Sequence, residues 1–312
     1  MSLTVLPAGS DDFTDAIGTR RELVRESARR SLVRRRITGR IAIGLSVGAV
    51  AISLAPLVAL VAYTTSRGIR ALSWDFFTHI PTPAGIPGGG ISSAIVGSVI
   101  IVGLAAAMAV PVGTMCALFL VERRGRLAGA LRFGADVLTG VPSIALGIFA
   151  YAVLVGPGSP IGHFSGLAGS FALAVLMLPI VIRASEASMR AVPRDLWEAG
   201  LALGVRRSRV VRSVVLRGAL PGLVTGNLLA VARAVGETAP LFVTVLGASL
   251  LVTNPLQPMG ALSLTIYSDG TQAYPAAQQT AWGTAFVLLA LVLVLSVVAR
   301  LVSARLTRQA RR

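Results

Sequence analysis

The stretch RASEASMRAVPRDLWEAGLALGVRRSRVVRSVVLRGALP, residues Arg183–Pro221, is the longest polar segment inside an otherwise apolar sequence. It contains eight arginines and is bounded on both sides by apolar runs. A helix is predicted at its centre, because Pro193 occupies a favoured position at a helix start. Gly204 suits the left-handed conformation that ends many helices. We expect this segment to be a surface on which another molecule acts.

The predicted central helix carries an apolar stripe. Leu196, Ala199, Gly200 and Leu203 are spaced at i, i+3, i+4 and i+7. Glu198 lies in the first turn, where the helix dipole favours an acid. One interpretation is a helix lying on lipid headgroups, with its arginines on anionic lipid. The small side chains of the stripe favour the other interpretation, close packing against a protein.

Composition places the chain in the membrane. Of its 312 residues, 54% are hydrophobic and 13% are charged, and the mean hydropathy is +0.77. Soluble domains are about a quarter charged. Several apolar runs exceed the length of about 18 residues that indicates a membrane span. The fold class predicted is an all-α polytopic membrane protein rather than a soluble helical protein.

Six transmembrane helices are predicted, over residues 41–63, 91–121, 133–155, 167–182, 218–245 and 280–299. The intervening residues 64–90 and 247–277 are expected to be loops; glycine and proline punctuation excludes a regular element in the first. The predicted domain organisation is an arginine-rich tail over 1–40, a membrane domain over 41–302 and a basic tail over 303–312. The first tail is expected to be partly helical from Ala16 onward, with a disordered start.

The arginines predict the orientation. The two tails and the loops after the second and fourth spans hold 26 of the 29 arginines. Basic segments stay on the cytoplasmic side of a membrane. Both termini and residues 183–221 are therefore predicted to be cytoplasmic. The same distribution explains the net charge of +16 through orientation in a bilayer, so no nucleic-acid partner is expected.

Several chemistries are excluded by missing residue types. The sequence contains no lysine, so it cannot form a P-loop, whose lysine reaches the nucleotide phosphates. Any ATP that drives this chain is expected on a partner. Cys116 is the single cysteine, which excludes an intrachain disulfide. His79 and His163 stand alone in the sequence, and no metal site is predicted.

The predicted fifth span contains two charges within ARAVGETAP, residues 232–240. Arg233 and Glu237 are spaced i, i+4 and are expected on one helix face. A lone charge in a span costs about 2.5–3.5 kcal/mol, so pairing or a wet cavity is expected. One interpretation is a structural ion pair. The other is a substrate path, in which Arg233 faces an oxyanion and Glu237 both holds it and weakens its grip.

Other polar residues lie near the third and fifth spans. Asp136 follows Arg132 by four positions, and the two are expected to form an ion pair at the cytoplasmic edge. Thr139, Ser143 and Thr244 have two interpretations: they line a path, or they join membrane helices by hydrogen bonds.

The motif Glu198-Ala199-Gly200-x3-Gly204, followed by Val214-x-Leu216, resembles the EAA loop of ABC importer permeases. In that family the loop's helix docks in a groove of a cytoplasmic ATPase. The sequence departs from the family at two places, with Gly200 for the second alanine and Arg217 at the usual proline. The resemblance implies a role in ATPase coupling for Leu196, Trp197, Glu198, Ala199, Gly200, Leu203 and Gly204.

The segment ARAVGETAPL, residues 232–241, resembles the A-type permease subunits of bacterial phosphate importers. Shorter matches lie at residues 88–91, 109–113 and 141–144, and the resemblance covers roughly residues 66–302. It implies the MetI-like importer fold and a substrate path at Arg233, Glu237 and Thr238. It also implies phosphate import across the inner membrane by alternating access, without bond chemistry on this chain.

The same resemblance implies the partners. These are a second permease subunit, an ATPase dimer that holds ATP and Mg²⁺, an external phosphate-binding protein and the lipid bilayer. No cofactor is expected on this chain. Two alternatives stay open: a permease for another oxyanion such as sulfate or molybdate, and an ATP-independent carrier or membrane scaffold for a sensor kinase.

Overall fold

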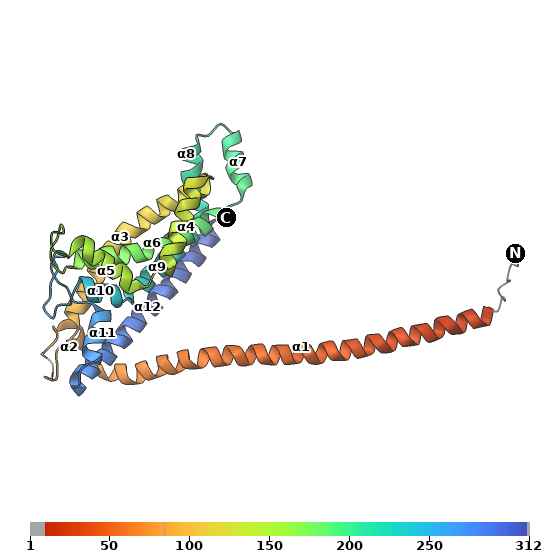
Figure 1. The fold of residues 1–312 in the computed structure, drawn as a ribbon, viewed down its shortest axis with the longest axis horizontal. Coiled ribbons are helices and arrows are strands. Elements are labelled where there is room, and N and C mark those ends of the chain that lie inside the picture. The colour runs from red at the N-terminus through yellow and green to blue at the C-terminus, as the bar shows by residue number, and fades with distance from the viewer. Residues whose placement is uncertain (1–9, 84, 311–312) are drawn as a thin grey trace. The chain divides into compact units, whose positions relative to one another are not determined.

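The computed structural model describes residues 10–83 and 85–310, in which every regular element is a helix (Figure 1). The chain divides into two compact units, Met1–Tyr63 and Thr64–Arg312. Among the described residues, five helices are long and apolar enough to cross a membrane, and one bent pair of shorter helices makes a sixth span if counted together. The predicted all-helical membrane class is confirmed, and the predicted six spans include one that is broken.

The first unit consists of most of α1, Ser10–Gly68. The prediction of a helix in the tail is confirmed, although the helix begins at Ser10 rather than Ala16. The predicted disordered start falls largely on residues 1–9, which lie outside the described residues. Large apolar side chains from Ile41 to Tyr63 are exposed. A helix that is apolar all round requires lipid or protein around it, as expected for a span. The predicted boundaries at residues 40 and 302 stay a prediction.

The second unit is organised around α6, Gly166–Arg190. In the most apolar 18-residue stretch of α6, 61% of the residues are buried. The corresponding share is 33% in α3, Ser92–Glu122, and 6% in α12, Pro275–Ala310. The main core cluster joins α3 and α6 to α9, Leu216–Val235. Because α6 is surrounded by helices of its own chain, it is the least available of the spans for contact with lipid.

Small residues allow these helices to approach closely. A Cβ added to Gly113 of α3 would lie 2.5 Å from Cγ1 of Val181 on α6. A Cβ added to Gly226 of α9 would lie 2.4 Å from Cβ of Ala184 on the same central helix. Small residues at helix interfaces are the usual means of close packing in membranes, where burial from water does not drive association.

The third predicted span, 133–155, is not one helix. It is divided between α4, Arg126–Gly140, and α5, Ser143–Leu154, which are bent by 108°. The break lies at Val141-Pro142. Val141 is extended, at φ −73° and ψ 131°, because the residue before a proline is disfavoured in the helical conformation. The proline quoted in the sequence therefore ends one helix and begins another.

The prediction that residues 64–90 and 247–277 are loops without regular elements is wrong, because both contain short helices. The first contains η1, Ile69–Ala71, and α2, Trp74–Thr78, while the second contains α11, Leu262–Gly270. Ser73 caps α2 by accepting a hydrogen bond from the Phe76 amide at 3.1 Å, and the Phe76 side chain is buried. Local capping and burial therefore produce a short helix close to a glycine- and proline-rich stretch.

The polar stretch from Arg183 forms one end of the second unit. α7, Arg194–Ala202, and α8, Arg207–Val210, lie at this end together with the C-terminal part of α12 (Figure 1). α2 lies at the opposite end (Figure 1). A single π-helical turn, η2 (Val211–Val215), connects α8 to α9. The segments predicted to be cytoplasmic thus lie at the same end of the unit.

Candidate functional site

The predicted fifth span, 218–245, is interrupted. α9 ends at Val235, and α10, Ala239–Thr244, begins after three residues. Gly236 is the C-terminal cap of α9, and Pro240 lies in the first turn of α10, where its missing N–H is not needed. The long apolar helical run instead begins earlier, at Arg207. The prediction of one helix over 218–245 is therefore wrong, and residues 236–238 form a non-helical break.

Arg233 and Glu237 lie on either side of the end of α9. Their Nε and Oε1 atoms are 3.5 Å apart. The predicted common helix face is wrong, because Glu237 lies beyond the last helical residue. The two charges are nevertheless brought together, with 63% of the Arg233 side chain exposed and 18% of the Glu237 side chain. The arginine is the accessible member of the pair.

The break is held by neighbouring elements. The Ser263 hydroxyl of α11 donates a hydrogen bond to the Glu237 carbonyl at 3.0 Å. Gly147 of α5 lies against α10, since a Cβ added to it would be 2.6 Å from Cα of Pro240. Thr238 is half-buried at the N-cap of α10, and its carbonyl accepts from the Phe242 amide at 2.9 Å. α11 therefore holds the backbone at Glu237, and α5 packs against the helix that follows the break.

Arg233 retains donors that could bind an anion. Only its Nε faces Glu237, and within the described part of the chain its two Nη atoms form no ion pair or hydrogen bond. Two adjacent Nη groups can donate in a fork to an oxyanion. Thr139 and Thr244 do not add to this site, because their hydroxyls donate to the carbonyls of Ala135 and Pro240 on their own helices.

The predicted coupling helix corresponds to α7, and its start at Arg194 is as expected. Trp197 packs on a small core cluster formed by α6, η2 and α9. Gly200 also faces inward, because a Cβ added to it would be 3.1 Å from Cγ2 of Val210. The predicted stripe is therefore divided, and its outward members include Leu196 and Leu203, which are 52% and 83% exposed.

A Schellman motif ends the coupling helix, as Gly204 predicts. Gly204 has φ +75°, and its amide donates to the Leu201 carbonyl at 2.9 Å. The Val205 amide donates to the Gly200 carbonyl at 3.3 Å. This ending reverses the chain sharply, so that α8 returns alongside α7.

The departure at Arg217 has a structural explanation. Arg217 lies inside α9, which follows the π-helical turn without interruption. Pro221 is accommodated one turn further along, also inside α9. The exit from the coupling segment is therefore a continuous helix, and its irregularity lies at Val211–Val215 instead of at a proline.

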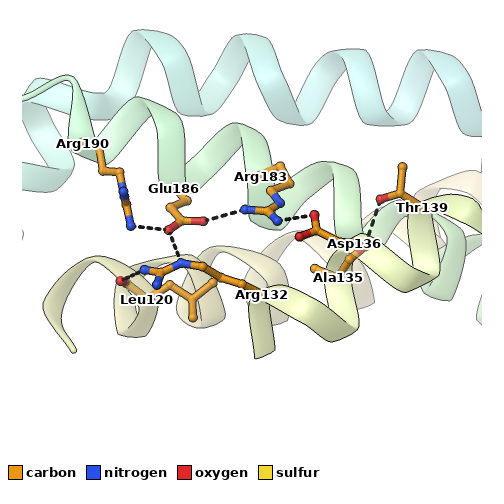
Figure 2. Close-up of polar contacts among 8 residues, drawn as sticks. All are labelled: Leu120, Arg132, Ala135, Asp136, Thr139, Arg183, Glu186 and Arg190. Atoms are coloured by element: carbon orange, nitrogen blue, oxygen red, sulfur yellow. Dashed lines mark hydrogen bonds and ion pairs between the residues drawn. The ribbon is translucent and has the colours of Figure 1, made fainter. Parts of the chain in front are cut away.

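A charged network was missed by sequence reasoning. Glu186 is buried and its carboxylate contacts three guanidinium groups, those of Arg132 at 2.9 Å, Arg190 at 2.7 Å and Arg183 at 3.5 Å (Figure 2). Arg183 also pairs with Asp136. The predicted Arg132–Asp136 pair is wrong, since each has a partner on α6 instead. The sequence did contain a signal for part of this network, because Arg183 and Arg190 lie three residues before and four residues after Glu186, where side chains on one helix can pair.

The same network ties three helices together. Nη2 of Arg132, on α4, donates to the Leu120 carbonyl near the end of α3 at 2.6 Å. Its Nε donates to Glu186 on α6. One side chain thus connects the helices that surround the base of the coupling segment (Figure 2).

Residues 109–308 match the model of a protein family described as "Binding-protein-dependent transport system inner membrane component". The chain belongs to this family. It is therefore a multi-pass transport subunit of a bacterial inner membrane, and not an ATPase. The match includes α7, the helix break at Gly236 and the Glu186 network.

Curated relatives are similar over almost the whole chain. A protein of Yersinia pestis named phosphate transport system permease protein PstA is 36% identical over 282 residues, which are 90% of this chain and 95% of the relative. A protein of Haemophilus influenzae with the same name is 39% identical over 269 residues, 86% of this chain and 94% of the relative. The chain therefore belongs to the PstA branch of its family.

The fold is shared with a solved importer. A chain in a structure titled "Inward facing conformations of the MetNI methionine ABC transporter" aligns with a TM-score of 0.54 and 21% identity. The alignment covers 71% of this chain and 98% of that chain. The predicted MetI-like permease fold is confirmed.

Proposed function

We propose that this chain is the PstA-type permease subunit of an ATP-driven importer that moves inorganic phosphate into the cytoplasm. The observation that carries the proposal is the similarity to PstA proteins over nine-tenths of the chain. The accessible Arg233 at a break in an apolar helix supports it, because guanidinium groups bind phosphate in a fork.

In this proposal Arg233, Glu237 and Thr238 lie on the substrate path. Phosphate is released from an external binding protein and passes between this chain and a second, related permease chain. Glu237 competes with phosphate for the guanidinium, so binding is weak enough for release. A charge pair at a break in a membrane-spanning helix is the kind of arrangement that marks ion pathways in membranes.

The coupling helix α7 is the proposed contact with a partner ATPase dimer, which binds ATP and Mg²⁺. Its outward face includes Leu196, Glu198, Ala199 and Leu203, all exposed in this chain. ATP binding closes the dimer and moves α7, and the two permease chains open outward. Hydrolysis then resets them. Trp197 and Gly200 transmit the movement, because they pack on the body of the chain.

The decisive experiment is ATP hydrolysis by the reconstituted complex with its external binding protein. Phosphate is expected to stimulate hydrolysis, whereas sulfate and molybdate are not. Stimulation by sulfate instead would assign the chain to another oxyanion. A crosslinker on Glu198→Cys is expected to capture an ATPase. Capture of a sensor kinase without an ATPase would identify a scaffold.

Arg233→Gln tests the substrate path. The variant is expected to abolish phosphate uptake while the complex still assembles, since the side chain is exposed and its loss leaves one half-buried carboxylate. Loss of assembly would show that the Arg233–Glu237 pair is structural. Arg70→Gln, which removes an exposed arginine far from the break in sequence, is the matched control.

A further inference from the structure

A cavity of about 810 Å³ lies at the base of the coupling helix. Its walls come from the end of α3, the following loop, α4, the end of α6, α7 and α8. Its volume falls within the range of about 300–1,000 Å³ that is typical of ligand pockets. None of the residues at the Arg233 break lines it, so this cavity is separate from the proposed substrate path.

The lining is strongly basic. Five arginines and two glutamates contribute to it. The glutamates are Glu122 and Glu198. Oε1 of Glu122 forms an ion pair with Nε of Arg207 at 3.6 Å. Since arginine is always charged, the lining carries an excess of positive charge at any physiological pH. An excess of positive charge in a concave site attracts anions.

Two of the arginines are fixed in place. Nε of Arg132 donates to Oε1 of Glu186, and Nη2 of Arg190 forms an ion pair with the same oxygen at 2.7 Å (Figure 2). Glu186 is buried and does not line the cavity. The carboxylate therefore orients both guanidinium groups without entering the cavity. Side chains that are held before binding lose little conformational freedom when a ligand arrives.

Two other arginines have no partner. Arg124, in the loop after α3, and Arg194, the first residue of α7, form no ion pair or side-chain hydrogen bond with any residue in the described ranges. Their guanidinium groups retain their full set of donors. Together with Arg132 and Arg190, they bring cationic donors to the cavity from the α3–α4 loop, α4, α6 and the coupling helix.

We propose that this cavity binds a phosphate-bearing anion on the cytoplasmic side, either free inorganic phosphate or the headgroup of an anionic phospholipid. The forked donors of arginine match phosphate oxygens. A bound anion would connect α7 to α3, α4 and α6 through its arginines, and would so restrain the coupling helix. If the ligand is free phosphate, the consequence, which rests on the proposed function, is that cytoplasmic phosphate slows the transport cycle that delivers it.

The binding test uses the full-length chain in nanodiscs of neutral phosphatidylcholine. Trp197 lines the cavity and serves as a fluorescent reporter. Inorganic phosphate is expected to change its emission saturably, whereas chloride at equal ionic strength is not. The change should be absent in Trp197→Phe, which keeps the other two tryptophans. A response equal to that of chloride would overturn the proposal.

The arginines are tested by two matched double variants. Arg124→Gln/Arg194→Gln removes the unpaired cavity arginines and is expected to weaken phosphate binding by about tenfold or more, because each loses a charge-assisted hydrogen bond. Arg123→Gln/Arg126→Gln removes the same charge from exposed positions that do not line the cavity, and is expected to bind normally. Equal weakening in both variants would overturn a specific site. Thermal unfolding of both variants checks that the fold is intact.

The two sources are distinguished by the lipid. If a phospholipid headgroup occupies the cavity, nanodiscs containing phosphatidylglycerol should abolish the fluorescence response of the wild type to phosphate. The same lipid should also raise the unfolding temperature of the wild type more than that of Arg124→Gln/Arg194→Gln. If free phosphate is the ligand, the response should be the same in both lipids. Absence of any anion effect, with weaker capture of an ATPase by Arg124→Gln/Arg194→Gln, would show instead that these arginines form a protein interface. The assay uses the permease alone, so its failure leaves phosphate-stimulated ATP hydrolysis by the complex as an independent result.

Discussion

The Nε atom of Arg132 donates to Oε1 of Glu186 across 2.9 Å, although the two residues are 54 positions apart. The bond joins α4 to the central helix α6, and a second bond from Arg132 reaches the end of α3. Glu186 is 5% exposed and is shared by three arginines. A carboxylate in this position stabilises the fold only while its partners are present.

Glu186→Gln is therefore expected to lower the free energy of unfolding by about 2–3 kcal/mol, because it removes a buried charge on which three guanidinium groups converge. Thermal unfolding in detergent measures the effect. Asp136→Asn is the control, since that carboxylate is 60% exposed and its pair with Arg183 is screened by solvent. A loss for Asp136→Asn as large as that for Glu186→Gln would contradict the central role of Glu186.

Gly97→Ala is expected to disrupt the packing of α3 against the residues before α11. A Cβ at this position would be 2.0 Å from the Gly260 carbonyl oxygen, a contact that only a backbone shift can relieve. The expected destabilisation is about 1–3 kcal/mol or more. Gly103→Ala, on the same helix with no atom within 4 Å of the added Cβ, should be neutral or stabilising. The two variants are compared by unfolding temperature.

Glu237→Gln is expected to strengthen the grip of Arg233 on phosphate, if both residues lie on the substrate path. Removing the competing carboxylate frees the Nε donor as well as the two Nη groups. Uptake should then reach half its maximal rate at a lower phosphate concentration, and the maximal rate should fall because release becomes slower. Unchanged half-saturation with reduced assembly would indicate a structural pair.

The free energy of unfolding is expected to depend on pH through the carboxyl group of Asp269. Burial raises the pKa of this carboxyl above its ordinary value, and a hydrogen bond with Ser268 opposes the rise. The folded state therefore holds the proton more tightly than the unfolded state. Its contribution to stability is fully present below the unfolded pKa, near 3.8, and is lost as the pH rises through the folded pKa.

Asp269→Asn removes this titration. The variant should gain stability relative to the wild type at neutral pH, and the difference should shrink as the pH is lowered toward the unfolded pKa. Unfolding temperatures of both proteins over a pH series measure the difference. Gln272 donates to the same carboxylate at 3.3 Å and can still donate to the asparagine carbonyl oxygen. A constant difference at every pH would refute the titration.

The spans could be predicted because their signal is local. Apolar length identified α3, α6 and α12, and the arginine distribution assigned both termini and α7 to one side. Pro193 and Gly204 predicted both ends of α7. Each of these inferences requires only neighbouring residues and the thickness of a bilayer.

The breaks could not be predicted from hydropathy, because Val141-Pro142 lies between apolar runs, and Gly236, although it is beside Glu237, lies in a stretch apolar enough overall to be taken as one span. A membrane proline can kink a helix or end it, and hydropathy does not distinguish the two outcomes. Helical spacing predicted that Arg233 and Glu237 share one helix face, yet their proximity arises where the chain has already left the helix.

The Glu186 network was beyond sequence reasoning for a different reason. Three of its members lie on α6, but Arg132 and Asp136 come from α4, and the partner of each is decided by how the two helices cross. Helical spacing pointed to an Arg132–Asp136 pair, and tertiary contact replaced it with two bonds between helices. The inward position of Gly200 was missed likewise, since it depends on the return of α8.

The π-helical turn at Val211–Val215 makes the chain sensitive to length at this point. One residue advances an α-helix by about 100°, so a turn that holds an extra residue rotates everything after it relative to α7. Deleting one residue there would leave α7 and the membrane spans individually intact. It would turn Gly226 away from Ala184 on α6, and it would rotate Arg233 and Glu237 together relative to α7. In this family member, the number of residues in one turn therefore sets the orientation of the cytoplasmic helix relative to the side chains in the membrane.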